Sequence, residues 1–263
     1  MADRFDTGET IYDLDTRADR VTLEREAGHI PRDYGKVPYG ALKFSARFPS
    51  DKILSASQQV AVLTEMKVQQ SRLSDVKRVQ KIRSSHQGNT SQCWAHSVVN
   101  IVRLIRALNG QPAVDLTASS LGQRINGGDG GGWSGQAMEF ICEKGIVPTS
   151  MWPENTFGRR LVTPEAEAAA MDYRVTEFWD LQTWDELISC LCMHGTGASG
   201  GWNHLGHAMA IIDAEVIDGA VAIRVWDSYG DDSRDEPGGT YLMRGRNANP
   251  DDMCATRAVT AVG

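Results

Sequence analysis

The sequence lacks the features that direct a protein to a membrane or to nucleic acid. Its 263 residues contain no apolar run close to the roughly 18 residues that a membrane-spanning helix needs. The first fifteen residues have neither a basic start nor an apolar core, so we expect no secretory signal peptide. The net charge of -7 at pH 7 disfavours a nucleic-acid-binding surface. We therefore expect neither a membrane nor a nucleic-acid partner, and a location in the cytoplasm or inside a larger assembly.

Cysteine is scarce and odd in number. The five residues are Cys93, Cys142, Cys190, Cys192 and Cys254. So few cysteines in so long a chain do not form a disulfide framework, and they favour a reducing compartment. Cys190 and Cys192 lie in an amphipathic helical pattern, without the second pair or the histidines that a zinc site needs. We expect no metal and no cofactor.

The composition is that of an ordinary globular protein, with 41% hydrophobic and 23% charged residues. The length suits one large domain, or one domain of about 200 residues with an extension. Residues 1–50 keep no helical or strand period, and prolines and glycines interrupt them repeatedly. We expect an irregular arm that is disordered or that packs over its own domain or a neighbour. With a helix predicted at 55–73, this arm gives a first region, 1–70, and the domain spans 71–263.

The domain changes character along its length. Periodicity and end signals predict helices at 93–108, 115–125 with Thr117 as its cap, 136–144, from 164 onward, and 183–193. A strand is expected at 173–178. After residue 195, β-rich runs alternate with turn residues such as Asp218-Gly219. We predict an α+β fold with a helical part, then an antiparallel β-rich part, and a functional site between them.

Cys93 opens the most strongly periodic helix of the sequence. Free N–H groups and the positive end of the helix dipole favour a thiolate at such a position, and the thiolate is the nucleophilic form of cysteine. Most buried cysteines are structural, so the position alone decides little. Gln87 lies six residues earlier, across a glycine-containing loop. Its carboxamide is placed to donate a hydrogen bond to an oxyanion beside the sulfur.

A histidine and an aspartate complete the set of residues that a cysteine nucleophile needs. His207 begins the run HAMAII, and Asp227 ends the run AIRVWD. Two antiparallel strands joined near residues 218–219 place the start of the first beside the end of the second. We predict that Cys93 attacks, His207 carries the proton, and Asp227 orients the imidazole. His204 is the rival base, and His207 is preferred because it enters the strand directly.

The segment 126–135 is too rich in glycine for a helix or a central strand. One interpretation is a flexible surface loop. The other is that the missing side chains allow a second backbone to approach closely, as in the binding of an extended peptide. Composition leaves both open.

These motifs together resemble papain-type (C1-type) cysteine peptidases. The family signature Q-G-x-x-x-x-C-W-A-x-S is matched by residues 87–97, and the similarity extends over roughly residues 75–245. Residues 137–146 resemble the following helix, His207-Ala208 the catalytic His-Ala pair, and residues 226–230 the family's N-S-W-G. The resemblance implies a two-lobed papain-like fold, with a helical left lobe and a β-rich right lobe. It also implies that Gly131 and Gly132 bind the substrate backbone.

The sequence departs from the family at several positions. Asp227 replaces the usual Asn, and a carboxylate also fixes the imidazole tautomer. Tyr229 replaces the Trp that shields this pair. Thr90 and Asp129 stand where secreted members have a disulfide, which suits a divergent bacterial or phage-like member. The segment between Gly195 and His207 is short, and residues 1–70 contain no known inhibitory-propeptide motif.

Three functions follow. The first is a thiol protease acting on peptide or protein substrates through Cys93, His207, Asp227 and Gln87. The second is a papain-fold structural component of a virion or another large assembly, held by a protein partner through residues 1–70. The third is a CHAP-like cell-wall amidase, which also pairs a helix-start cysteine with a Gly-His strand, although Gln87 and the glycine pair favour papain. An arm lying across the cleft indicates inhibition, and an arm directed away from it indicates assembly.

Overall fold

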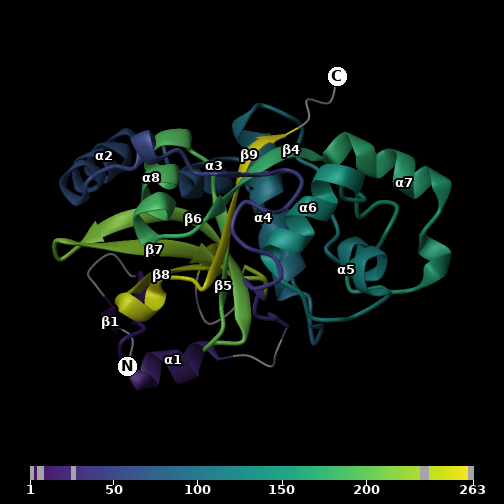
Figure 1. Ribbon diagram of the computed structural model, residues 1–263, viewed down its shortest axis with the longest axis horizontal. Helices are drawn as coiled ribbons and strands as arrows, with labels where there is room; N and C mark the ends of the chain where they lie inside the picture. The colour runs from purple at the N-terminus through teal and green to yellow at the C-terminus, as the bar shows by residue number, and fades with distance from the viewer. Residues whose placement is uncertain (1–2, 5–8, 25–27, 232–236, 260–263) are drawn as a thin grey trace.

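A mixed sheet and a group of helices lie on opposite sides of helix α4 (Cys93–Leu108) in the computed structural model (Figure 1). The structure describes residues 3–4, 9–24, 28–231 and 237–259. On one side are α5 (Ser119–Asn126), α6 (Ser134–Lys144) and α7 (Pro164–Ala170). Every residue of α4 from Cys93 to Ala107 is buried, because the helix packs between these helices and the sheet. The arrangement is the predicted α+β fold with two lobes.

The sheet contains nine strands in the order β1-β2-β8-β7-β6-β5-β9-β4-β3. Their bounds are Asp3–Arg4, Thr10–Asp13, Ser45–Arg47, Val175–Leu181, Ala198–Trp202, His207–Ile217, Ala220–Trp226, Thr240–Arg244 and Asp252–Val259 for β1 to β9. The central strands β8-β7-β6-β5-β9-β4 pair antiparallel, as predicted. Strands β2 and β3 add parallel pairs to β8 and β4, so the sheet is mixed where we expected an antiparallel one.

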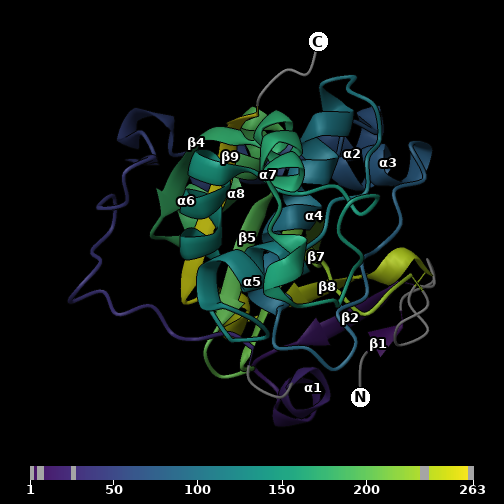
Figure 2. The ribbon, with the colours of Figure 1, turned by 90° about the vertical axis from the view of Figure 1, so that its right-hand side faces the viewer.

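Residues 1–50, which we expected to be an irregular arm, form regular elements: β1, β2, β3 and helix α1 (Arg17–Leu23). The helix predicted at 55–73 is present as α2 (Ala56–Gln69). Thr16 caps α1, and Ser55 and Gln58 form a capping box at the start of α2. Strands β1 to β3 and helix α1 are short, so they carry little periodic signal in the sequence. Figure 2 shows the purple and blue N-terminal part running along one side of the molecule from α1.

Residues 1–70 also contribute to the hydrophobic core. Leu14, Leu23, Phe48 and Leu63 are buried in the same cluster as residues of β6, β7 and α8 (Trp184–His194). Burial of such side chains stabilises a fold by about 1.5–3 kcal/mol each. The N-terminal region therefore packs on its own domain, and the boundary at residue 70 does not separate two cores.

One element that was not predicted and one predicted helix with different bounds complete the local structure. Helix α3 (Leu73–Val79) follows α2, and its Asp75 side chain caps the backbone N–H of Arg72. Helix α5 starts at Ser119 and not at residue 115, and Thr117 does not cap it. Short 3₁₀ helices lie at Ser50–Lys52, Arg159–Leu161, Met171–Tyr173, Pro237–Gly239 and Arg246–Ala248. No helix in the described ranges is both long and apolar enough to cross a membrane.

Candidate active site

Cys93 is the first residue of α4, and its side chain faces the opposite lobe. The residue is 1% exposed. The first N–H groups of an α-helix have no partner within the helix, so the Cys93 N–H points out of the helix end. Cys93 and His207 interact across the boundary between the helical lobe and the sheet, and this interaction helps to raise the pKa of His207. The predicted nucleophile and the predicted base are therefore in contact.

His207 and Asp227 are adjacent because of the β6–β7 pairing. Ala210 pairs with Trp226, so the start of β6 lies beside the residue that follows β7. His207 Nε2 donates to Asp227 Oδ1 at 2.8 Å, and both side chains are buried. This bond leaves Nδ1 for Cys93 and fixes the ring orientation. Burial alone would lower the pKa of His207, but the charge and hydrogen bond of Asp227, together with Cys93, raise it to about 10.

Three neighbours hold Asp227 and His207, and the sequence singled out only one of them, Tyr229, for this role. The Ser228 N–H donates to Asp227 Oδ1 at 2.8 Å, and the Tyr241 hydroxyl donates to Asp227 Oδ2 at 3.1 Å. The Tyr229 ring stacks on the His207 ring, with centroids 5.7 Å apart and planes 27° apart. Tyr229 thus lies where the resemblance implied a shielding aromatic. Tyr241 comes from β8, which no local motif links to the site.

Gln87 is tied to the same loop as Asp227. Its N–H donates to the Ser228 carbonyl at 2.7 Å, and its Oε1 accepts from the Ser228 hydroxyl at 2.5 Å. Its Nε2 donates one proton to the Thr90 carbonyl at 2.9 Å. A carboxamide carries two such protons, so one remains for a further acceptor. Ser228 therefore orients Gln87 and Asp227 together.

Two other histidines are in different positions. His204 lies in the exposed turn between β5 and β6, where burial of part of the ring lowers its pKa. His96 lies inside α4, bonded to Ser85 Oγ at 2.8 Å, and burial lowers its pKa to about 3. The base that contacts Cys93 is His207, so the geometry favours it over the rival His204.

The glycine-rich loop meets the N-terminal region directly at the site. Residues Gly28, His29 and Ile30, here called the covering segment, run parallel to Gly132. The Gly132 N–H donates to the Gly28 carbonyl at 3.0 Å, and the Ile30 N–H donates to the Gly132 carbonyl at 2.8 Å. A Cβ at Gly132 would lie 2.7 Å from the Trp94 ring, so only glycine permits this approach. Of the two interpretations of 126–135, the structure supports close approach of a second backbone.

The covering segment passes over the sulfur of Cys93. A Cβ added to Gly28 would lie 2.8 Å from Cys93 Sγ. The His29 ring is buried against Gly201 of β5, and its Nε2 lies 3.0 Å from Asn203 Oδ1. The His29 N–H donates to the Gly206 carbonyl, next to His207. The segment therefore contacts both lobes on either side of the candidate nucleophile.

A hydrogen bond holds the loops where secreted papain-type enzymes have a disulfide. Asp129 Oδ1 accepts from the Ser91 N–H at 2.7 Å and from Gln92 Nε2 at 3.4 Å. This carboxylate connects the loop before α4 to the glycine-rich loop. Unlike a disulfide, this link between the two loops does not require an oxidising compartment.

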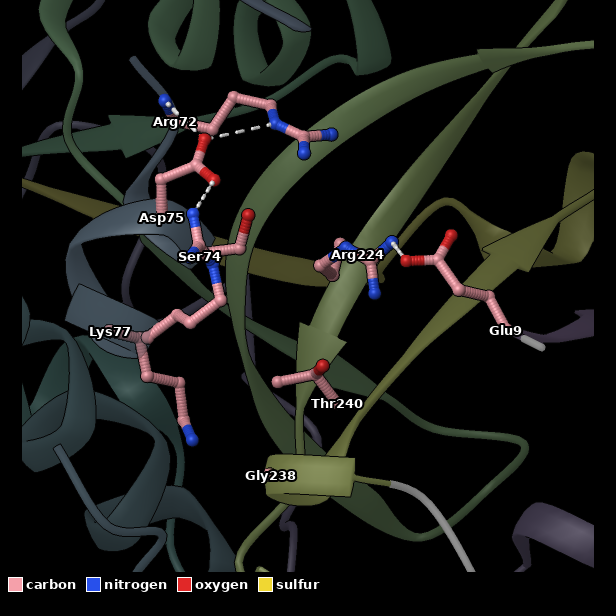
Figure 3. Close-up of a pocket in the computed structure, with 9 residues that line it drawn as sticks. Glu9, Arg72, Ser74, Asp75, Lys77, Arg224, Gly238 and Thr240 are labelled. Carbon is pink, nitrogen blue, oxygen red and sulfur yellow. Dashed lines mark hydrogen bonds and ion pairs between the residues drawn. The ribbon is translucent and has the colours of Figure 1, made fainter. Parts of the chain in front are cut away.

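A cavity of about 360 Å³ lies elsewhere, between α3 and strands β7 and β8 (Figure 3). Its charged groups pair with one another: Arg224 with Glu9 at 2.8 Å, and Arg72 with Asp75 at 3.5 Å. Lys77 lies over the Trp226 ring. None of the residues that line the cavity belongs to the Cys93 site. Its charges are already paired within the protein, so we do not regard it as the functional site.

Solved structures share this architecture, whereas no protein-family model and no curated protein matches the sequence. Xylellain, a cysteine protease from Xylella fastidiosa, is 16% identical with a TM-score of 0.64, covering 90% of this chain and 96% of that chain. Procathepsin B S9 from Trypanosoma congolense is 14% identical with a TM-score of 0.58, covering 92% and 88%. Digestive procathepsin L 3 from Tenebrio molitor is 16% identical with a TM-score of 0.56, covering 68% and 66%. The chain has the two-lobed fold of papain-like cysteine proteases, as the sequence predicted.

Proposed function

We propose that this protein is a cysteine peptidase that hydrolyses peptide bonds through Cys93, His207, Asp227 and Gln87. The observation that carries the proposal is the chain of contacts from Cys93 to His207 to Asp227, which crosses between the lobes at the start of a helix. An imidazole held by a carboxylate beside a thiol at a helix N-terminus is the arrangement that produces a reactive thiolate. Gln87 and the Cys93 N–H supply the oxyanion donors.

The reaction follows from these positions. The Cys93 thiolate attacks the carbonyl carbon of the substrate, and the resulting oxyanion accepts hydrogen bonds from the Cys93 N–H and Gln87 Nε2. The His207 imidazolium gives its Nδ1 proton to the leaving amine as the C–N bond breaks, which leaves a thioester. A water molecule then adds to the thioester carbonyl while His207 accepts a proton, and the thiolate leaves. Asp227 keeps the imidazole oriented throughout.

We infer further that the covering segment inhibits the peptidase. It places Gly28 over the sulfur and occupies the backbone donor and acceptor of Gly132, which the family resemblance assigns to the substrate. The Gly28 carbonyl accepts a hydrogen bond from the Gly132 N–H, so the glycine-rich loop holds this carbonyl. The segment therefore blocks the site while it is bonded to the loop that we assign to the substrate.

The assembly role remains the alternative from a different class. The described contacts of residues 28–30 are with the cleft of their own chain, which favours inhibition over binding to another subunit. The papain-like fold with its glycine-rich cleft loop favours a peptidase over a CHAP-like amidase. The substrate is proposed to be a peptide or protein.

Labelling with an epoxysuccinyl thiol-protease inhibitor tests the proposal. We expect slow, stoichiometric labelling of the intact chain that disappears in Cys93→Ala and persists in Cys192→Ala. Cys192 is the matched control because it is only partly buried, whereas Cys142, Cys190 and Cys254 are buried. Burial raises the pKa of Cys192 to about 11. If the folded chain stays unlabelled even after a substitution weakens the contacts of the covering segment, the peptidase proposal is wrong. The assembly role then becomes the preferred hypothesis.

A further inference from the structure

Gln92 directly precedes the candidate nucleophile, and its side chain contacts the glycine-rich loop. The residue is fully buried, although glutamine is usually found at protein surfaces. Its Nε2 donates to the Gly130 carbonyl at 3.0 Å and to Asp129 Oδ1 at 3.4 Å. One carboxamide therefore holds two successive residues of the loop against the start of α4.

Gly122 of α5 provides the space that this side chain occupies. A Cβ at Gly122 would lie 2.7 Å from Gln92 Nε2 and still closer to its Oε1. Glycine is unfavourable inside a helix, and the backbone of Gly122 is not in the left-handed region that requires it. Close packing against Gln92 is therefore the reason that the structure gives for glycine at this position.

The orientation of the Gln92 carboxamide is fixed, although one of its ends is unpaired. Both groups beside Nε2, the Gly130 carbonyl and the Asp129 carboxylate, are acceptors that only the NH2 end can satisfy. Gln92 Oε1 has no hydrogen-bond partner in the part of the chain that the structure describes. A buried oxygen without a partner destabilises a fold, so stability alone does not account for a glutamine here.

The atoms that Gln92 holds lie next to those that we assign to the substrate. Gly130 comes two residues before Gly132, whose N–H and carbonyl pair with the covering segment. The Gly130 carbonyl also accepts from Trp94 Nε1 at 3.1 Å. The residues on either side of Cys93 thus both bind the same carbonyl of the loop.

We propose that Gln92 is a positioning residue, which fixes the glycine-rich loop relative to the sulfur of Cys93. The inference rests on the proposed peptidase function. A peptide bound at Gly132 reacts only if its carbonyl carbon also reaches the sulfur, so the distance between loop and sulfur affects the rate. A small alkylating reagent needs the thiolate alone. Loss of the Gln92 contacts therefore slows reaction with a peptide more than reaction with a small reagent.

Two labelling rates of Cys93 in the full chain, one with a peptidyl epoxysuccinyl inhibitor and one with iodoacetamide, test this role. Both reagents react with the uncovered thiolate of folded protein, so the ratio of the two rates cancels the extent of opening and of folding. Gln92→Met keeps the length of the side chain and removes both hydrogen bonds to the loop. We expect this variant to lower the ratio of peptidyl to iodoacetamide labelling roughly tenfold.

Gly122→Ala should lower the same ratio, because the added carbon displaces the carboxamide of Gln92. Gly128→Ala is the matched control, since Gly128 lies in the glycine-rich loop and its added carbon meets no atom within 4 Å. A double variant, Gln92→Ala with Gly122→Ala, should have the same ratio as Gln92→Ala alone, because the displaced side chain is already absent.

An unchanged ratio in Gln92→Met would overturn the positioning role while leaving Cys93 reactive. An equal fall in Gly128→Ala, or a further fall in the double variant, would also overturn it, because the effect would then come from the loop or from α5 and not from Gln92. Absence of peptidyl labelling in every variant would overturn the peptidase proposal, and the positioning role with it.

Discussion

A methyl group on the α-carbon of Gly28 would lie 2.8 Å from the sulfur of Cys93. This distance is shorter than a normal contact, so the covering segment fits over the thiol only because residue 28 is glycine. The same added carbon would lie 3.0 Å from the backbone of Ser91, which cannot move aside as a flexible side chain can. A substitution at Gly28 therefore tests directly whether the covering segment blocks access to Cys93.

Gly28→Ala should displace the covering segment and expose the thiol. We expect epoxysuccinyl labelling of Cys93 to become at least several-fold faster than in the unaltered chain, with little change in thermal stability. Gly35→Ala is the control, since Gly35 lies in the same region and its added carbon meets only the Asp33 side chain, at 3.2 Å. Equal labelling rates in both variants and in the unaltered chain would show that the segment does not limit access.

Ile30→Pro tests the backbone pairing of the covering segment. Proline has no N–H, so the variant loses the 2.8 Å bond to the Gly132 carbonyl. Such a bond contributes about 0.5–1.5 kcal/mol, which corresponds to roughly a two- to tenfold larger open population. We expect labelling of Cys93 to accelerate by that factor.

Ile30→Val serves as its control because it keeps the N–H and the branched side chain. Ile30 is 51% exposed, so trimming it removes little packing. If Ile30→Val accelerates labelling as much as Ile30→Pro does, the effect comes from the side chain, and the pairing with Gly132 is not what closes the site.

The sequence predicted the arrangement of Cys93, His207 and Asp227 better than it predicted the covering segment, for a physical reason. The period of α4 placed Cys93 at a helix start, and a hairpin placed His207 beside Asp227, because both depend on regular elements with short connections. The pairing of His29 with Gly132 joins residues far apart in sequence and follows from the absence of side chains, which has no period. The composition of the glycine-rich loop left a flexible loop and a close approach equally open, and it did not indicate a partner.

The elements within residues 1–50 were harder to predict because each of them is short. Helix α1 and strands β2 and β3 hold only a few buried side chains each, so no repeat is visible over 1–50. They become stable through long-range pairing with β8 and β4. Tyr241 was missed for a similar reason: β8 reaches Asp227 through the sheet, and the residue itself sits in an ordinary strand pattern.

Leu14→Ala tests whether the N-terminal region is part of the core. Leu14 is fully buried, so we expect a loss of about 2–5 kcal/mol in the free energy of unfolding, measured by denaturant titration. Val21→Ala, in α1 and 55% exposed, should change it by less than about 0.5 kcal/mol. By the same reasoning, removal of residues 1–70 should unfold the domain. A stable, truncated protein would show that this region is an independent arm.

Asp227→Asn tests how the carboxylate that replaces the family's usual Asn affects pH dependence. Against the effect of burial, Asp227 raises the pKa of His207 from its ordinary value to about 10, so the imidazolium persists through the mildly alkaline range. Epoxide opening takes up a proton, and His207 supplies it while it is charged. In Asp227→Asn the ring keeps a hydrogen-bond acceptor but loses the negative charge, so the imidazolium deprotonates at lower pH. We expect the alkaline fall of the Cys93 labelling rate to move to lower pH, while Asp218→Asn, on the exposed β6–β7 turn, leaves it in place. An alkaline limb that does not move in Asp227→Asn would mean that another group, and not the His207–Asp227 pair, provides the proton.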